Sequence, residues 1–276
     1  MAKLLQTLIP LFSSIVLLLA TAAKMGRSQS TSFTYDFWGD QPTELLYQGD
    51  ANFPSDSTFL RLTKTTASGS AVGFSIGRLV YPTPVTFWEA GAQVDFVSTL
   101  NFLISPNAGD TNPADGLTFF IAPVGLPLGF TGGCFGIFNS SGIGPSVFAV
   151  EFDIFSNAGV DPSYRHIGID IETRVSKNVT DVGDALLGQR VTAIISYKEA
   201  TKLISVCVAA GSQKYEVSYV YDLSAILPQQ VQVGISAGTG GAVAVHDLVS
   251  WSFTSTPVHG GATAGQEEEG YIRQYV

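Results

Sequence analysis

The sequence predicts an all-β protein, a sandwich or barrel built from many short strands. Short runs with apolar residues at every second position alternate with clusters of glycine, proline, asparagine, aspartate and serine. No segment of helix length shows a 3.6-residue apolar period, and no fixed-period repeat indicates a propeller or solenoid. Glycine and proline supply 29 and 13 of the 276 residues, as expected for a chain with many turns.

The predicted strands follow one another along most of the chain. Each is a short alternating run bounded by turn residues, and no linker interrupts the series, so we interpret residues 31–255 as one domain. The predicted strands are residues 32–37, 59–64, 94–104, 116–122, 147–152, 167–172, 191–197, 215–220, 231–236 and 247–254.

Both ends of the chain differ from this pattern. Residues 1–30 resemble a secretory signal peptide, with Lys3 before a mostly apolar stretch and small residues for cleavage between 22 and 30. Polar residues interrupt that stretch, and no later segment has 18 consecutive apolar residues, so we expect no membrane span. We expect passage through the secretory pathway to an extracellular or vacuolar location. Residues 256–276, rich in glycine and then glutamate, are interpreted as a mobile or processed tail.

The charge balance restricts the possible partners. The chain has 14 basic and 23 acidic residues, and its first 30 residues hold three basic residues and no acidic one. The remainder therefore carries 11 − 23 = −12. This charge argues against binding to nucleic acid or to an anionic membrane, which needs clusters of lysine and arginine. It is compatible with cations and with neutral ligands.

Two sequons and two cysteines bear on processing. In a secreted protein, Asn139 and Asn178 are candidate N-glycosylation sites on surface loops. Cys134 and Cys207 are too few for a disulfide scaffold, and they either form one bridge or remain free thiols. Because Cys207 lies in an apolar run, a buried free thiol is one of these alternatives.

The region with most chemical information lies between residues 150 and 170. Alternation along a strand places Glu151 and Asp153 on one face, and Asn157, Asp161 and His166 follow in a loop. Oxygen donors of this kind suit Ca²⁺, and an imidazole beside carboxylates suits a transition ion such as Mn²⁺ or Zn²⁺. The alternative is a polar strand edge with an acidic turn and a structural histidine.

Several ordered motifs extend this observation over essentially the whole domain. Together they resemble the legume lectin family. The matching segments are residues 150–170, 114–123 (ADGLTFFIAP), 132–138 (GGCFGIF), 246–253 (HDLVSWSF), 48–51 (QGDA), 77–81 (GRLVY) with Pro84-Val85, and the Ser32-Phe33 start.

The resemblance implies a flattened jelly-roll sandwich of two large antiparallel sheets, with a Ca²⁺/Mn²⁺ pair beneath a sugar site. The residues that match the Mn²⁺ ligands are Glu151, Asp153, Asp161 and His166. Those that match the Ca²⁺ ligands are Asp153, the carbonyl of Phe155, Asn157 and Asp161. The residues that match the sugar site are Asp115 as acceptor, the Gly133 amide and Asn157 as donors, and Phe155 beneath the sugar ring. The resemblance also implies a cis peptide bond between Ala114 and Asp115.

Four residues, at three places in the chain, depart from the family pattern. Val160 stands where tryptophan is usual, and Cys134 takes an aromatic position in the glycine-rich loop. Gly241 and Ala242 occupy the last specificity loop without a polar side chain, so that only their backbone amides are available to a sugar.

Three functions follow as hypotheses. The resemblance favours a non-enzymatic lectin that binds a monosaccharide or glycan, commonly as a homodimer or homotetramer. A second hypothesis is a lectin-related defence or storage protein with weak or lost sugar binding, which loss of the metal ligands would mark. A third is a glycoside hydrolase on a similar sandwich; Phe155 occupies the position where Glu151 would need a carboxylate partner.

Overall fold

The computed structural model describes residues 30–55, 57–89 and 91–259. The predicted signal peptide, apart from residue 30, lies outside the described residues, as does the predicted tail from residue 260 onward. No helix within the described ranges combines the length and apolar character that a membrane crossing requires.

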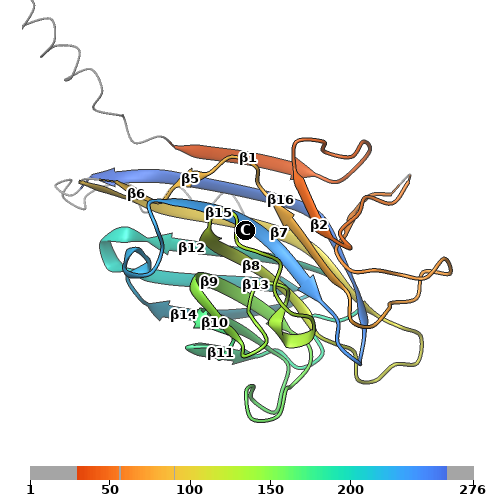
Figure 1. Cartoon of the computed structure of the whole chain (residues 1–276). Coiled ribbons are helices and arrows are strands. Elements are labelled where there is room, and N and C mark those ends of the chain that lie inside the picture. Colours follow the sequence, from red (N-terminus) through yellow and green to blue (C-terminus); the bar gives the residue numbers. More distant parts are fainter. Residues whose placement is uncertain (1–29, 56, 90, 260–276) are drawn as a thin grey trace, which may run out of the picture.

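Two antiparallel sheets of eight strands each form the fold, as the all-β sandwich prediction requires (Figure 1). The back sheet has the order β1 (Thr31–Asp36), β16 (Ala244–His259), β7 (Ala92–Pro106), β12 (Arg190–Lys198), β13 (Leu203–Ala210) and β14 (Gln213–Val220), with β3 (Leu60–Arg61) beside β16 and β6 (Trp88–Glu89) beside β7. The front sheet has the order β11 (Asn178–Asp181), β10 (His166–Thr173), β9 (Ile143–Asp153), β8 (Gly116–Pro123), β15 (Gln230–Gly238), β4 (Ile76–Val80) and β2 (Leu46–Gly49), with β5 (Val85–Thr86) beside β15. Three single-turn 3₁₀ helices complete the described elements: η1 (Gly132–Cys134), η2 (Glu199–Thr201) and η3 (Leu223–Ala225).

All ten predicted strands are present, with bounds that differ by a few residues. The largest difference is at the C-terminal strand, because β16 continues to His259, past residue 255 where the sequence analysis ended the domain. The strands not named from the sequence are β2, β4, β5, β6, β11 and β13. Most of these are too short to show an alternating pattern, and in β13 the apolar residues occupy both faces of the strand.

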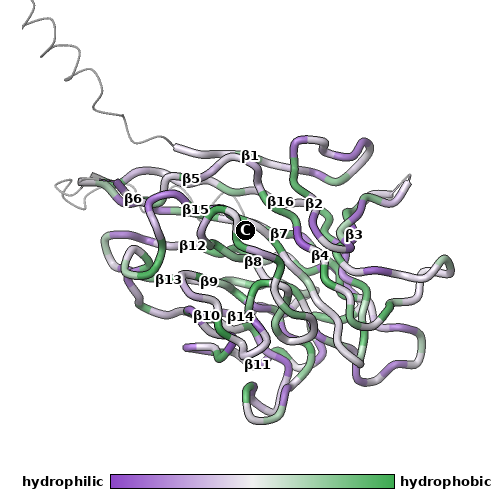
Figure 2. Tube along the Cα trace, viewed as in Figure 1, coloured by the Kyte–Doolittle hydropathy of each residue, from purple (hydrophilic) through white to green (hydrophobic). Residues whose placement is uncertain are grey.

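The main hydrophobic core lies between the two sheets. The ring of Phe96 in β7 lies 5.9 Å from that of Tyr197 in β12 and 6.2 Å from that of Phe119 in β8, measured between centroids. Phe102 in β7 and Phe152 in β9 are 4.9 Å apart. Both sheets therefore contribute aromatic side chains to one packed layer, in which such pairs add to the stabilisation from burial. Figure 2 shows the corresponding alternation of hydrophobic and polar residues along the strands.

The central strands of the front sheet are buried on both faces. On the outer face, a second apolar cluster fills the space under the loop between β8 and β9, which carries η1. This outer cluster consists of Val80, Phe120, Ala122, Cys134, Phe135, Ile137, Phe138, Val147 and Ala149. The Arg78 guanidinium, itself 1% exposed, fixes the same loop by donating to the carbonyls of Leu126 and Pro127. The loop is thus part of the packed structure.

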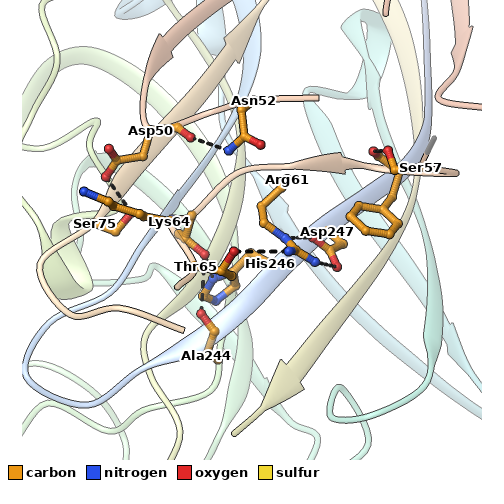
Figure 3. A network of polar contacts seen from close by, with 12 residues as sticks. Asp50, Asn52, Ser57, Arg61, Lys64, Thr65, Ser75, Ala244, His246 and Asp247 are labelled. Atoms are coloured by element: carbon orange, nitrogen blue, oxygen red, sulfur yellow. Dashed lines mark hydrogen bonds and ion pairs between the residues drawn. The ribbon is translucent and has the colours of Figure 1, made fainter. Parts of the chain in front are cut away.

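A polar network connects the start of β16 with the loops near it (Figure 3). Arg61 donates to both carboxylate oxygens of Asp247, at 2.8 and 2.9 Å. The Ser75 hydroxyl donates to Asp50 at 2.7 Å, and the Ser75 backbone amide donates to the Thr239 hydroxyl at 3.0 Å. These bonds fix the segment after β15 to the segment before β4, so the loop that begins at Thr239 has a defined position.

The two cysteines are both free, so the predicted disulfide alternative is wrong. Cys134 is buried in the outer cluster. Cys207 is exposed, which also contradicts the expectation of a buried thiol. In β13, Ile204, Val206 and Val208 face the core, and the alternation of the strand places Cys207 on the opposite face.

The burial of His246 leads to a prediction about the stability of the protein in acid. Its Nδ1 lies 3.0 Å from the Thr63 hydroxyl, and burial lowers the pKa of the imidazole to about 3. Between this value and the ordinary value of 6.5, the unfolded chain binds a proton that the folded chain does not. The contribution of His246 to stability is therefore complete above pH 6.5 and declines as the pH falls toward 3.

We expect the free energy of unfolding, measured in urea from pH 7 to pH 4, to fall more steeply in the native protein than in His246→Asn. The difference in slope should approach about 1.4 kcal/mol per pH unit, the value for one proton. Comparison with the variant isolates His246 from the buried carboxylates. Parallel pH profiles for the two proteins would show that His246 does not titrate in this way.

Candidate functional site

Three predicted metal ligands meet on the outer face of the front sheet. Glu151 and Asp153 of β9 pair in register with Gly168 and His166 of β10, so their side chains share one face. Ligand atoms of Glu151, Asp153 and His166 all lie within 4.8 Å of one another, and all three side chains are buried. Atoms this close can all reach one ion at ordinary coordination distances.

Two further polar residues, Asp170 and Ser176, were not named in the sequence analysis. Together with Glu151, Asp153 and His166 they form what we call the acidic cluster. The Ser176 hydroxyl lies 2.6 Å from Glu151 Oε1 and 2.7 Å from Asp170 Oδ1, and Asp170 Oδ2 has no hydrogen-bond partner among the described residues. One hydroxyl has a single proton, so it cannot donate to both carboxylates. Either one of the two carboxyl groups is protonated or another positive charge is present. Gly168 is required here, because a Cβ at this position would overlap the Ser176 hydroxyl.

Burial dominates the protonation of the acidic cluster. It raises the pKa of Asp153 and that of Asp170 well above the ordinary value, and the neighbouring Glu151 raises both further. Burial lowers the pKa of His166, but the 2.9 Å hydrogen bond with Glu151 and the negative charges of Glu151 and Asp161 together outweigh this effect, so the net shift is upward. In this medium, which solvates charge poorly, the ionised carboxylates are unfavourable unless a positive charge neutralises them.

The predicted loop residues lie directly beyond the end of β9. The backbone amide of Phe155 donates to Asp153 Oδ1 at 2.7 Å, and that of Asn157 donates to Asp161 Oδ2 at 2.7 Å. Phe155, Asn157 and Asp161 are half-buried. Burial raises the pKa of Asp161, and the Asn157 amide lowers it. The structure therefore places Asp161 next to the acidic cluster, but its carboxylate is not among the ligand atoms of Glu151, Asp153 and His166 that lie close together.

Asp115 lies at the start of β8, on the same side of the front sheet. The Ala114–Asp115 peptide bond is cis, as the resemblance implied. The Asp115 carboxylate is 3% exposed, and its Oδ2 has no hydrogen-bond partner among the described residues. Burial raises the pKa of Asp115 to about 7, whereas the backbone amide of Gly240 and the charge of Arg174 lower it.

The glycine-rich loop lies between Asp115 and Asn157. A Cβ on Gly132 would be 3.8 Å from both Asp115 carboxylate oxygens, and a Cβ on Gly133 would overlap Asn157 Oδ1. The Gly132 amide donates to the Thr239 carbonyl at 3.2 Å, which connects this loop to the one after β15. Asp115, Gly133 and Asn157, predicted from three distant parts of the sequence, are therefore brought together.

In the loop after β15, which the resemblance gives as the last specificity loop, the residue that approaches Asp115 is Gly240, which the sequence analysis did not name. A Cβ on Gly240 would be 3.3 Å from Asp115 Oδ2, whereas Gly241 is exposed with open space around it and Ala242 is half-buried. The Gly240 carbonyl accepts from the amide of Phe74, whose side chain is 73% exposed. Nothing local in the sequence distinguishes Gly240 from its glycine neighbours.

Both candidate glycosylation residues are exposed. Asn139 lies in the turn before β9, and its Oδ1 accepts from the backbone amides of Ser141 and Ile143. Asn178 lies in strand β11 rather than in the loop that we expected, and its Nδ2 donates to the Ser218 carbonyl at 2.8 Å. An edge strand presents alternate side chains to solvent, so this position is still accessible.

A two-sheet sandwich with an acidic, histidine-containing cluster beside an Asp–Gly–Asn surface site is the architecture of a carbohydrate-binding lectin. The legume lectin domain model matches residues 30–268. The chain therefore belongs to the legume lectin family, whose members bind carbohydrate and are not enzymes. This assignment sets aside the glycoside hydrolase hypothesis.

Individual proteins agree with the family assignment. The chain is 38% identical over 280 residues to Agglutinin-2 of Cladrastis kentukea, with 97% of this chain and 94% of that protein covered. It is 34% identical over 241 residues to a mannose/glucose-specific lectin of Centrolobium tomentosum, with 83% and 97% covered. The solved structure of winged bean acidic lectin, complexed with methyl-alpha-D-galactose, superimposes with a TM-score of 0.77 at 36% identity, covering 84% of this chain and 100% of that one.

The contact between Gly133 and Asn157 can be tested by adding one methyl group. In Gly133→Ala, the new Cβ overlaps the end of the Asn157 side chain, so we expect Asn157 to rotate away while the loop remains folded. Carbohydrate binding, measured on a glycan array, should fall by about tenfold or more because a hydrogen-bond donor is lost. The urea midpoint should change little.

Gly241→Ala is the matched control, because open space surrounds that position. Because alanine also retains the backbone amide of residue 241, this variant should bind as the native protein does. Equal binding by both variants would mean that the position of Asn157 against Gly133 is not important for the ligand.

Proposed function

We propose that this protein is a lectin that binds a sugar at Asp115, Gly133 and Asn157, and that a Ca²⁺/Mn²⁺ pair organises this site. The observation that carries the proposal is the convergence of these three residues directly beside the buried acidic cluster. Asp115 supplies a buried acceptor without a partner, and the other two supply N–H groups. Acceptors and donors in this combination match the vicinal hydroxyls of a sugar.

The acidic cluster has the chemistry of a divalent cation site. Glu151, Asp153, Asp161 and His166 would hold Mn²⁺, and Asp153, the Phe155 carbonyl, Asn157 and Asp161 would hold Ca²⁺. When bound, the ions supply the positive charge that the buried carboxylates lack and favour their ionised forms. The upward pKa shifts of Asp153 and Asp170 support this fit. So does the Ser176 hydroxyl, which lies within hydrogen-bond distance of two carboxylates but has one proton to donate.

Backbone hydrogen bonds position the residues that would contact the sugar. The Asp115 carbonyl accepts from the Ile154 amide at 2.9 Å, which fixes Asp115 to the end of β9. The Asn157 carbonyl accepts from the amides of Val160 and Asp161, so the Asn157 backbone is held in a turn. Phe155 is half-buried at the start of this turn and would lie under the apolar face of the ring. A lectin-related protein without sugar binding is less well supported, because every predicted metal ligand is present.

Metal removal gives the first test of this proposal. Chelation should abolish sugar binding and lower the thermal midpoint, and Ca²⁺ with Mn²⁺ should restore both, because ions that bind only the folded state stabilise it. At 100 times the dissociation constant the effect is about 2.7 kcal/mol. Glu151→Gln should shift the metal titration to higher concentrations, whereas Glu216→Gln, on the exposed face of β14, should leave it unchanged. Full sugar binding by metal-free protein would contradict the proposed mechanism.

Asp115→Asn gives the second test, because it retains the shape and removes the charged acceptor. Loss of a charge-assisted hydrogen bond typically costs about 1.5–3 kcal/mol, so we expect sugar affinity in calorimetry to fall by more than about tenfold. The metal content and thermal midpoint should be nearly unchanged. Asp110→Asn, in the same loop, is the control and should bind normally. Native affinity in Asp115→Asn would place the sugar elsewhere.

A further inference from the structure

An arginine that the family pattern did not predict lies next to the proposed sugar site. Arg174 follows β10, and its backbone amide donates to the Gly142 carbonyl at 3.0 Å. Its side chain then extends toward the glycine-rich loop, where a Cβ on Gly133 would be 3.5 Å from Nη1. That same Cβ would overlap Asn157 Oδ1, so the guanidinium and the Asn157 amide group lie on the same side of Gly133.

The backbone at Gly142 restricts the path of the Arg174 side chain. A Cβ on Gly142 would be 2.6 Å from Arg174 Nε and 2.8 Å from its Cγ, so only glycine leaves room for this side chain. Gly142 also has a φ of 74°, a conformation that favours glycine. The arginine is half-buried and confined by this contact. It therefore approaches the site in a restricted set of conformations.

The charge of Arg174 is not neutralised by its neighbours. Among the described residues, its guanidinium makes no hydrogen bond or ion pair, whereas the guanidinium groups of Arg61, Arg78 and Arg165 do. It lies near enough to Asp115 and Asp161 to lower the pKa of each, but it forms a bond with neither. Carboxylates that hold cations, as proposed above, are not available to pair with it.

We propose that Arg174 makes this lectin selective for acidic carbohydrates, in which a carboxylate or sulfate ester pairs with the guanidinium while ring hydroxyls bind Asp115 and Asn157. The inference rests on the proposed sugar site and specifies the substrate class of that site. Guanidinium presents a planar fork of N–H donors that matches these anions in bidentate fashion. The carboxylate of Asp115 meanwhile disfavours an anion on its own side of Gly133, which gives the ligand one orientation.

Matched sugar pairs test this inference in the full-length protein saturated with Ca²⁺ and Mn²⁺. The probes are methyl glycosides of glucose and glucuronic acid, of galactose and galacturonic acid, and of galactose with and without a 6-sulfate, together with N-acetylneuraminic acid. In calorimetry at low salt, we expect at least one acidic sugar to bind about tenfold or more tightly than its neutral partner. The advantage should shrink as sodium chloride is raised. The uronic acid and sulfate pairs distinguish a carboxylate from a sulfate ester.

The variants assign the effect to Arg174. Arg174→Gln should remove the preference for the acidic sugar while affinity for the neutral partner, metal content and thermal midpoint stay close to native values. Arg174→Lys, which retains charge without the planar fork, should keep only part of the preference. Arg190→Gln, an exposed arginine at the start of β12 in the other sheet, controls for net charge and should keep all of it.

Each outcome has a definite meaning. Neutral sugars that bind as well as or better than their acidic partners would overturn this inference and leave the proposed lectin function intact. An acidic preference that survives Arg174→Gln would also overturn it. Failure of every neutral and acidic sugar to bind the metal-saturated protein would instead refute the sugar site itself, and with it the inference.

Discussion

Buried negative charge on the outer face of the front sheet is the constraint on which the site depends. Asp153 and Asp170 are withdrawn from water beside Glu151, where the partners on the described chain are the Phe155 amide, the His166 imidazole and the Ser176 hydroxyl. Isolated ionised carboxylates are very unfavourable in such a medium. The divalent cations proposed above would supply this compensation.

The site is assembled from loops that are far apart in the sequence but start at neighbouring strands. Asp115 precedes β8, Gly133 lies between β8 and β9, Asn157 follows β9, and Gly240 follows β15. Strands β9, β8 and β15 are adjacent in the front sheet, so these loops meet at its outer face and end. The acidic cluster forms the base of this arrangement. Changes in one loop can therefore alter one wall of the site while the sheets that position the others remain as they are.

The sequence predicted the fold class, and several of the residues that it singled out lie together in the structure, for identifiable physical reasons. Alternation in strands such as β7 and β9 is visible locally, and Glu151, Asp153 and His166 lie within one strand–loop–strand unit whose register brings them together. Cys207 was misjudged because β13 is apolar on both faces, so composition could not determine its direction. Arg174 and Gly240 could not be found from the sequence, since their relevance depends on contacts across loops that only the tertiary structure creates.

The outer apolar cluster has a consequence for how ligands associate. Phe135, Ile137 and Phe138 pack against Phe120 under the loop that carries Gly133, and Arg78 holds the other end of that loop. The conformational entropy of this loop is thus lost when the chain folds, and little of it is left to lose when a ligand arrives. A rigid recognition surface of this kind is expected to show similar association rates for related ligands. Discrimination among them then resides in how long each complex lasts, that is, in the dissociation rate.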